Sequence, residues 1–423
     1  MKRYIFLTLM ACAGTGCTEK ISTAPDLGFL QVNPRTAEVV IPFDDFVDEI
    51  LVFGGHGSTA DIDHGLVAVD HGGLNARTLV LLGFYPTDSD QQPGTLIFSD
   101  GRIVIFFDTL RGIVDSPVDI EVFQVVEDWH PRSMTWDFAV DTAGEQRAWS
   151  QPGGGLTTLL GGATFRPAQG DSVSIPIDSA TVVALGEVID GRPSGLLVTG
   201  AEPGVFLQVV DVVLRLTSRT AQVPGQVFEE TVVVFNLGFM FDPAPTAPLG
   251  WLRVGGTPSW RTVFTMSIPR LVTGTPEICG SVGCQVDLTE VEVNLAELVL
   301  TARQTQLAWQ PQDTTRVDIR PVLNPELLPK SPLGDPVAAV PKGVPPEFFS
   351  VQAGTEVLLS LTSLVAQIFD TAAETGTVPV TSIALFTAPE PGLIGFASFE
   401  GPGGPGAPVL RLLYTVANPV GLP

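Results

Sequence analysis

The sequence has few basic residues, few cysteines and no apolar run of membrane-spanning length. Lys and Arg number 22 against 46 Asp and Glu among 423 residues, which gives a formal net charge of −24 at pH 7. A surface of this sign repels nucleic acid and anionic lipid headgroups, so neither is expected as a partner. The apolar run at residues 4–13 is too short to span a bilayer as a helix.

The motifs of common enzyme classes are also missing. The chain has no nucleophile elbow, no phosphate-binding glycine loop and no His-Glu-x-x-His pattern. Asp119 and Glu121 alternate along an expected strand, so we interpret them as its solvent face rather than as a glycosidase pair. The sequence therefore predicts a protein that is not an enzyme and that needs no cofactor.

Residues 1–17 are expected to form an export signal. Residues 1–17, MKRYIFLTLMACAGTGC, place Lys2 and Arg3 before the apolar run and small residues before Cys17. This layout predicts a secretory signal. Its end resembles a bacterial lipobox, which implies a lipid on Cys17 and anchoring at the outer membrane or cell surface. Ordinary cleavage without a lipid is the alternative. Residues 18–35 are expected to form a tether, and the lipid is expected to be the sole contact with the membrane.

Two further cysteines lie in the second half of the chain. Cys279 and Cys284 stand at the ends of CGSVGC, which contains two glycines. Because an exported protein meets oxidising conditions, the pair is predicted to form a disulfide that closes a tight hairpin. A metal site would need more ligands than this pair supplies, and no histidine lies nearby in the sequence.

Short segments that favour β-structure make up most of the chain. Runs such as GRIVIFFDTL and TRVDIRPVL are separated by turns, and the sequence holds 44 Gly and 36 Pro. This pattern predicts an all-β sandwich or barrel. In SLTSLVAQIF, residues 360–369, the apolar positions Leu361, Leu364, Val365 and Ile368 have helical spacing. They predict one short helix that closes the end of a sandwich.

The chain also repeats itself at a long interval. Three motifs recur in unchanged order: GLVAV at 65–69 as GWLRV at 250–254, EPG at 202–204 and 390–392, and VLRL at 213–216 and 409–412. We infer two copies of one domain, a first repeat at residues 36–221 and a second repeat at residues 222–423. The boundary is expected in the polar segment 217–226, which contains proline and glycine.

A family resemblance extends this interpretation. The segment from Trp129 to Trp136, a tryptophan followed by a polar turn and then Thr-Trp, resembles the signature of DNRLRE-type domains. Similar features are the strand beginning at Arg77 and the strand Val118 to Val126 that leads into the tryptophans. The resemblance implies two tandem jelly-roll-like β-sandwich domains, exported and non-catalytic, related to carbohydrate-binding modules. The second repeat lacks the tryptophan signature.

Three tryptophans of the first repeat are the candidate carbohydrate-binding residues: Trp129, Trp136 and Trp149. Flat indole faces stack on sugar rings, but a tryptophan directly after a strand also packs over the end of a sandwich. Core packing is favoured for Trp129 and Trp136. Trp149 lies beside SQPGGG and is the residue expected to touch a ligand.

A histidine-rich segment is the candidate metal site. It contains His56, His64 and His71 together with Asp63 and Asp70. Imidazoles and carboxylates bind zinc and other divalent cations. Their spacing matches no compact zinc pattern, so no metal is predicted and an exposed turn is the favoured interpretation.

Together these features predict an exported, lipid-anchored monomer that binds extracellular or cell-wall polysaccharide, or a surface protein, without cleaving it. The first alternative is a structural or adhesive spacer that binds no sugar. The second alternative is a metal-dependent hydrolase that uses the segment from His56 to His71.

Overall fold

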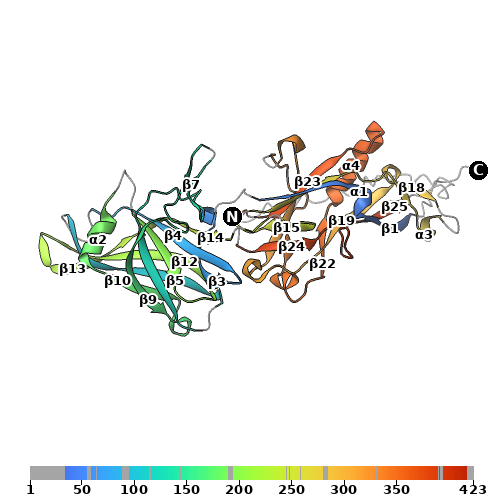
Figure 1. Ribbon diagram of the computed structural model, residues 1–423. Coiled ribbons are helices and arrows are strands. Elements are labelled where there is room, and N and C mark those ends of the chain that lie inside the picture. Colours follow the sequence, from blue (N-terminus) through green and yellow to red (C-terminus); the bar gives the residue numbers. More distant parts are fainter. Residues whose placement is uncertain are drawn as a thin grey trace, which may run out of the picture.

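The structure is a computed structural model. It describes residues 34–416 except 55–58, 63, 88–94, 114–115, 143, 189–193, 244, 247, 258, 280–283, 329–330, 389 and 391–393. The fold is almost entirely β, as the sequence predicts, and it consists of two β-sandwiches that lie end to end (Figure 1). The signal at 1–17, its Cys17 and nearly all of the expected tether lie outside the described residues. Within the described part of the chain, no helix has the length and apolar character needed to cross a membrane.

One sandwich, the continuous sandwich, is formed by residues 65–242. Its strands are β3 (Gly65–His71), β4 (Leu74–Leu82), β5 (Leu96–Ile113), β6 (Val118–Val125), β9 (Thr157–Phe165), β10 (Ser172–Ile177), β11 (Gly195–Gly200), β12 (Val205–Thr220), β13 (Val223–Val232) and β14 (Val234–Asp242). One layer has the order β10-β5-β12-β13 and the other β14-β4-β11-β6-β9, and β3 pairs with both β12 and β4. A hairpin of β7 (Phe138–Asp141) and β8 (Gln146–Ala148) and the helix α2 (Ser179–Gly186) lie outside these layers.

Alternating apolar residues fill the space between the two layers. In β5 the side chains of Ile103, Ile105 and Phe107 point inward and pack against Ile120 and Val122 of the opposite layer. Successive side chains of a strand point to opposite faces, so this period of two is what places GRIVIFFDTL in a sandwich core.

The other sandwich, the discontinuous sandwich, is formed by residues 35–53 and 251–416. Its strands are β1 (Arg35–Pro42), β2 (Val47–Phe53), β15 (Trp251–Gly255), β16 (Arg261–Met266), β19 (Glu292–Thr301), β20 (Thr315–Pro321), β21 (Lys342–Val344), β22 (Glu356–Ser360), β23 (Thr381–Thr387), β24 (Phe396–Glu400) and β25 (Val409–Val416). One layer has the order β22-β19-β25-β1 and the other β2-β16-β23-β20-β21, while β15 pairs with β24. A hairpin of β17 (Leu271–Thr273) and β18 (Gln285–Asp287) extends from it.

The helical segments are short. They are α1 (Phe43–Phe46), α3 (Pro276–Cys279), α4 (Thr362–Thr375) and the 3₁₀ turns η2 (Thr59–Asp61), η3 (Pro167–Gln169), η4 (Leu288–Glu290), η5 (Leu307–Trp309), η6 (Pro325–Leu327) and η7 (Pro346–Phe349). The helix predicted around 360–369 is α4, which buries Leu364, Val365 and Ile368 against the core and ends at Gly376 in the left-handed conformation. Glycine adopts that conformation without a Cβ clash, and this fixes where the helix stops.

The strand pairing corrects the division expected from the sequence. Strand β1 lies antiparallel to β25, from Arg35 opposite Val416 to Pro42 opposite Val409, and β2 pairs with β16. The leading strands of the first repeat therefore complete the discontinuous sandwich, which is otherwise built from the second repeat. Conversely, β13 and β14 of the second repeat pair with β12 and β4 and complete the continuous sandwich.

The segment expected to link two domains is a hairpin instead. Strand β12 continues to Thr220, which lies opposite Val223 at the start of β13, so residues 221–222 form a tight turn. Pro224 and Gly225 lie within β13. Because β13 is an edge strand, proline and glycine are tolerated there, and they mark a strand rather than a linker.

An apolar cluster joins the two sandwiches at their junction. The continuous sandwich contributes Leu66, Ala68, Leu74, Ala76, Phe206 and Phe239, and Ile62 joins them from the segment just before β3. The discontinuous sandwich contributes Trp260, Ala308, Trp309, Ile394 and Phe396. The Trp309 ring lies 5.5 Å from the ring of Phe241 and 6.0 Å from that of Phe396, measured between centroids. Residues of both sandwiches are thus buried against one another.

Candidate functional site

The segment from Trp129 to Trp149, here called the tryptophan tract, is packed into the continuous sandwich. Trp129 and Trp149 are each 5% exposed, in a cluster that includes Leu79 and Met240. The indole Nε1 of Trp149 donates a hydrogen bond to the carbonyl of Thr135 at 2.9 Å. An indole buried in this way has no free face for a sugar ring, so the structure does not support ligand contact by Trp129 or by Trp149.

Trp136 is half-buried, and a cation covers its ring. The guanidinium carbon of Arg77 lies 5.1 Å from the centroid of Trp136, and Arg77 Nη1 donates to the carbonyl of Gly153 at 2.7 Å. Gly153 has a φ of +84°, and a Cβ there would lie 3.0 Å from both Arg77 and Trp136. Burial lowers the pKa of Arg77. Trp136 is thus a packed wall of the tract rather than an open platform.

A carboxylate holds the loops of the tryptophan tract together. Glu127 accepts hydrogen bonds from the backbone N–H groups of Ser150, at 3.0 Å, and Leu156, at 2.6 Å. Desolvation raises the pKa of Glu127, but the hydrogen bonds from Ser150 and Leu156 outweigh it and hold that pKa below its ordinary value. Glu127 is therefore a structural anion that joins the end of β6 to the segment before β9.

The candidate metal residues are dispersed where the structure describes them. The ring of His71 is buried, and its centroid lies 5.0 Å from that of Phe206, while His64 stacks on Phe239. Asp70, near the end of β3, donates its backbone N–H to the side-chain oxygen of Asn75. His56 and Asp63 lie outside the described residues. Among the described residues, no three His, Cys, Asp or Glu side chains gather where they could hold a metal ion.

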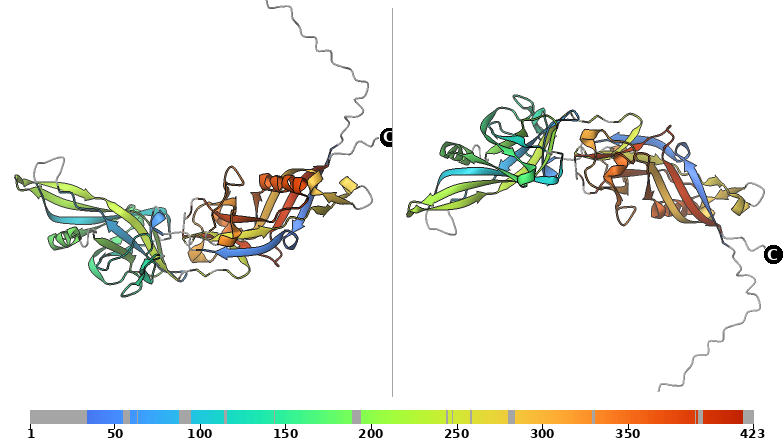
Figure 2. Two further views of the ribbon diagram at one scale, coloured as in Figure 1. Left: turned by 90° about the horizontal axis from the view of Figure 1, so that it is seen from above. Right: turned by 90° about the horizontal axis from the view of Figure 1, so that it is seen from below.

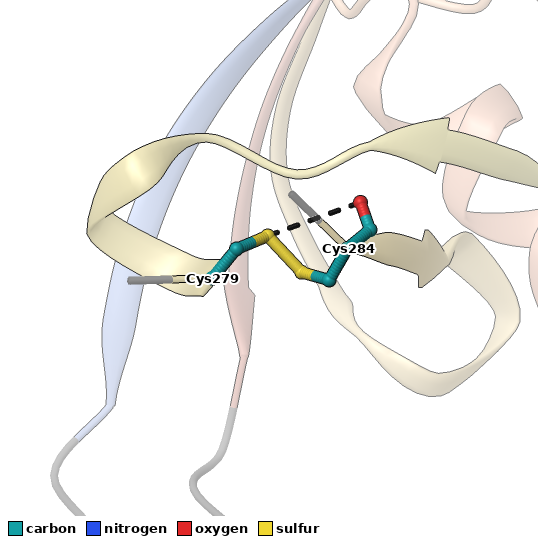
Figure 3. Close-up of a disulfide and its surroundings, with 2 residues drawn as sticks. All are labelled: Cys279 and Cys284. Carbon is teal, nitrogen blue, oxygen red and sulfur yellow. Dashed lines mark hydrogen bonds between the residues drawn. A yellow bond between two sulfur atoms is a disulfide. The ribbon is translucent and has the colours of Figure 1, made fainter. Parts of the chain in front are cut away.

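The predicted disulfide is present. Cys279 at the end of α3 is bonded to Cys284 just before β18, with Cα atoms 5.5 Å apart (Figure 3). The Sγ of Cys279 also lies 3.8 Å from the carbonyl oxygen of Cys284. The bond closes the β17–β18 hairpin, which is the structural role that the sequence indicates.

An open cleft on the discontinuous sandwich is a candidate site for ligand binding. It encloses about 720 Å³ between the start of β15, the end of β24 and the loop that follows β19. Its polar and aromatic lining includes Trp251, Arg303, Gln304, Gln306, Gln310 and Glu400. Concave sites with an aromatic wall and a few fixed polar groups are typical of ligand-binding clefts.

Trp251 and Arg303 form the centre of this cleft. The Arg303 guanidinium carbon lies 3.6 Å from the centroid of the half-buried Trp251 ring, and Arg303 Nη1 donates to Glu400 Oε2 at 2.8 Å. A guanidinium stacked on an indole is held flat, and its remaining N–H groups keep a fixed direction. Cation, carboxylate and indole are therefore preorganised side by side.

The loop that carries the glutamines is anchored at both of its ends. The backbone N–H of Arg303 donates to the carbonyl of Ser398 at 2.9 Å, and the buried hydroxyl of Thr305 donates to the Ser398 hydroxyl at 2.9 Å. Further along, Trp309 is buried in the junction cluster. Gln304 and Gln306 between these anchors are exposed. Their amides stand at the cleft on a fixed backbone.

The cleft also lies next to the other sandwich. A Cβ placed on Gly72, in the β3–β4 turn, would lie 3.4 Å from the backbone nitrogen of Ala308. The continuous sandwich thus packs against η5, the turn that follows the two exposed glutamines. Ligand sites occur preferentially at such boundaries between packed units.

The lining groups suit neutral, hydroxyl-rich ligands. Amides both donate and accept hydrogen bonds, and the Arg303–Glu400 pair offers N–H donors beside carboxylate acceptors, which matches neighbouring sugar hydroxyls. Glu400 is the one carboxylate among the described lining residues, and Arg303 neutralises it. The lining of the cleft therefore favours ligands that carry no net charge.

Sequence reasoning missed this cleft. From the sequence, Trp251 is recognised only as part of the repeated GWLRV motif. The glutamines in RQTQLAWQPQ, residues 303–312, have no predicted role. The signal was a tryptophan directly after Gly250 together with a glutamine-rich loop. Neither feature shows that the two segments meet, because β24 lies between them in space and far from both in sequence.

Comparisons with known proteins add little. No family model and no curated protein matches this chain. The structure of the N-terminal CBM22-1-CBM22-2 tandem domain from Paenibacillus barcinonensis Xyn10C is similar at 9% identity and a TM-score of 0.16, over 88% of this chain and 97% of that chain. The structure of the Macrobrachium rosenbergii nodavirus is similar at 8% identity and a TM-score of 0.13, over 99% and 97%. At such TM-scores neither likeness carries an argument about fold or function.

Proposed function

We propose that the protein is a non-catalytic binding protein that holds polysaccharide in the cleft around Trp251. The stacked pair of Trp251 and Arg303, braced by Glu400 and flanked by glutamine amides, carries this proposal. The net charge of −24 disfavours acidic polysaccharides through repulsion, so the ligand is expected to be an uncharged extracellular or cell-wall glycan.

The proposed location follows from the export signal and from the position of β1. A lipid on Cys17 anchors the chain at the outer membrane or cell surface. Strand β1 starts beside the end of β25, at the end of the discontinuous sandwich farthest from the continuous one (Figure 2). A tether leading into Arg35 would place the discontinuous sandwich next to the membrane and direct the continuous sandwich away from it.

The test is a binding assay on the full chain with a panel of neutral and acidic polysaccharides. Trp251→Ala is expected to weaken binding of the retained polysaccharide about tenfold or more, because the aromatic wall is lost. Trp251→Phe keeps a smaller ring, so its affinity for the polysaccharide is expected to lie between those of the unsubstituted chain and Trp251→Ala. Leu249→Ala is the matched control, since Leu249 is 95% exposed and lies just before the cleft without lining it.

Thermal unfolding of each variant establishes that the sandwich is intact. Loss of binding in Trp251→Ala with an unchanged unfolding temperature supports the proposal. Equal affinity of Trp251→Ala and Leu249→Ala would remove the cleft as the binding site. No affinity of the unsubstituted chain for any polysaccharide in the panel would remove the proposed function itself.

A second candidate function is a structural or adhesive spacer. The apolar junction favours this candidate, because Phe239 and Trp309 are buried where the sandwiches meet. A spacer has to keep its two ends at a fixed distance, and a buried junction restricts bending between the sandwiches. Small-angle scattering distinguishes a rigid elongated particle from two sandwiches on a flexible linker. A rigid particle without polysaccharide affinity would establish this candidate over the first.

A further inference from the structure

The leading strand pairs of the two repeats occupy equivalent places in the two sandwiches. Strand β13 flanks β12 and β14 flanks β4, as β1 flanks β25 and β2 flanks β16. Thr78 in β4 lies opposite β14 and donates to the carbonyl of Leu66 at 2.9 Å. Thr262 in β16 lies opposite β2 and donates to the carbonyl of Arg253 at 2.8 Å. Each pair covers the same two edges of its sandwich.

Similar sequences lie near the start of the two repeats, although Thr220 still belongs to β12 and Phe43 to α1. Residues 36–39 are Thr-Ala-Glu-Val, and residues 220–223 are Thr-Ala-Gln-Val; residues 43–45 are Phe-Asp-Asp, and residues 228–230 are Phe-Glu-Glu. Both pairs are thus the opening element of a repeat. Neither pair, however, completes the sandwich that the rest of its own repeat forms. Completion by a strand pair from another repeat is therefore how both sandwiches are built.

Removal of β1 and β2 would leave the discontinuous sandwich with an incomplete core and two open edges. Ala37, Ile41, Phe43 and Phe46 from this segment are buried in the core of the discontinuous sandwich. Without them β25 and β16 would expose backbone N–H and C=O groups along two open edges, which are templates for any matching strand. The strand pair that matches them best is another β1–β2 pair.

We propose that the exchange also occurs between molecules, so that β1 and β2 of one molecule complete the discontinuous sandwich of a second copy. The contacts in that assembly repeat those of the monomer, so its stability relative to the monomer depends on chain concentration and on the connections between the sandwiches. A reciprocal exchange of two chains leaves no edge uncovered and gives a closed dimer.

The connections allow this arrangement. The sandwiches are connected twice, by residues 54–64 and by residues 243–250. Residues 54–64 join the exchanged pair to the rest of its chain, and an extended chain of this length reaches about 38 Å. Within one chain the effective concentration of β1 and β2 is high, so the monomer dominates in dilute solution and exchange becomes visible when chains fold together at high concentration.

Cysteine pairs placed across β1 and β25 test the proposal. Thr36 and Thr415 lie opposite each other in the register, with their hydroxyl oxygens 3.0 Å apart. Full-length Thr36→Cys, labelled with a heavy isotope, and unlabelled Thr415→Cys are unfolded together and refolded at low and high concentration. Mass spectrometry of the digested product identifies the linked pair, which separates it from links made by Cys12 and Cys17.

The expected result is a link between labelled position 36 and unlabelled position 415 whose yield rises at least several-fold with chain concentration. The particle mass measured by light scattering should double in the same samples. The control pair is Thr36→Cys with Thr164→Cys, because Thr164 is exposed on β9 of the continuous sandwich. The doubly substituted chain, Thr36→Cys with Thr415→Cys, should close within itself in dilute solution.

Two outcomes would overturn the proposal. One is a yield of the 36–415 link between chains that stays at the level of the control pair at every concentration. The other is failure of the doubly substituted, folded chain to close, which would show that β1 does not lie on β25 at all.

Discussion

At the scale of single residues, burial decides what each tryptophan does. Trp149 is 5% exposed and donates its indole N–H to Thr135, so its contribution is to stability. Trp149→Ala is expected to lower the free energy of unfolding by about 3–5 kcal/mol, since a large buried ring is replaced by a cavity. Trp149→Phe keeps most of the apolar area but leaves the Thr135 carbonyl unpaired, at a cost of about 1 kcal/mol.

Urea unfolding followed by circular dichroism measures both variants. Leu110→Ala is the control, because Leu110 is 94% exposed and its truncation should change stability by less than about 0.5 kcal/mol. If Trp149→Ala unfolded at the same urea concentration as Leu110→Ala, the indole would not be part of the core.

The sequence could locate the tryptophans but not the direction in which they point. A tryptophan after a strand has the same local pattern whether it folds over the sandwich or faces solvent, and tertiary neighbours decide between the two. Trp129 and Trp149 are held inward by partners such as Met240, which comes from a strand of the second repeat. For the same reason the sequence around Trp251 does not show that this side chain lines a cleft, since Arg303 and Glu400 reach it from distant segments.

At the scale of elements, the β17–β18 hairpin depends on an ion pair as well as on its disulfide. Arg270 Nε donates to both oxygens of Asp287, at 3.0 and 2.8 Å, and the Thr289 N–H donates to the same carboxylate at 3.0 Å. The hydrogen bond from Arg270, assisted by Thr289, holds the pKa of Asp287 well below its usual range.

The pH dependence follows from the direction of this shift. A carboxyl with a lowered pKa in the folded state adds stability above its unfolded pKa, about 3.9, and that stability is lost as the pH falls through the folded pKa. Asp287→Asn should therefore unfold at a lower temperature than the unsubstituted chain at pH 6. The difference between the two should shrink as the pH falls below about 4.

Thermal unfolding from pH 7 to pH 2 measures this difference. Asp45→Asn, an exposed change on α1, serves as the control for general charge effects. A gap between Asp287→Asn and the unsubstituted chain that stayed constant into the acid range would show that the Arg270 pair does not stabilise the fold.

Elements with a strong local period were predicted well, and those defined by their partners were not. The apolar spacing of Leu364, Val365 and Ile368 is sufficient to identify α4, because a helix is built from contacts near in sequence. The sequence predicts a linker where the β12–β13 hairpin lies, since Pro224 and Gly225 usually interrupt a strand. Only the position of β13 at the edge of its layer makes them acceptable there.

At the scale of the whole molecule, the repeat predicts two sandwiches but not which strands complete them. Recurrence of VLRL at 213 and 409 identifies equivalent strands, β12 and β25, in the two copies. It carries no information on whether β25 pairs with β1 or with β13, because β12 and β25 share that motif. Within one chain, β13 and β14 of the second repeat complete the continuous sandwich. The boundary of this folding unit therefore lies at residue 242 and not at residue 221.

This shift makes a prediction about fragments. Residues 59–242 contain every strand of the continuous sandwich and are expected to fold alone, with reduced stability because Phe206 and Phe239 lose their cover at the junction. Residues 36–221 match the sequence repeat but lack β13 and β14, so β12 and β4 keep open edges. That fragment is expected to aggregate or remain unfolded.

Circular dichroism and limited proteolysis compare the two fragments, and coexpression provides the control. When residues 36–221 and 222–423 are produced together, each fragment supplies the strand pair that the other lacks, so both should become soluble and purify as one complex. A cooperatively folded 36–221 fragment would contradict the exchange, because β1 and β2 would then have closed on the sandwich of their own repeat. Recovery of the complex from two fragments that fail alone would show that the repeats fold only by completing one another.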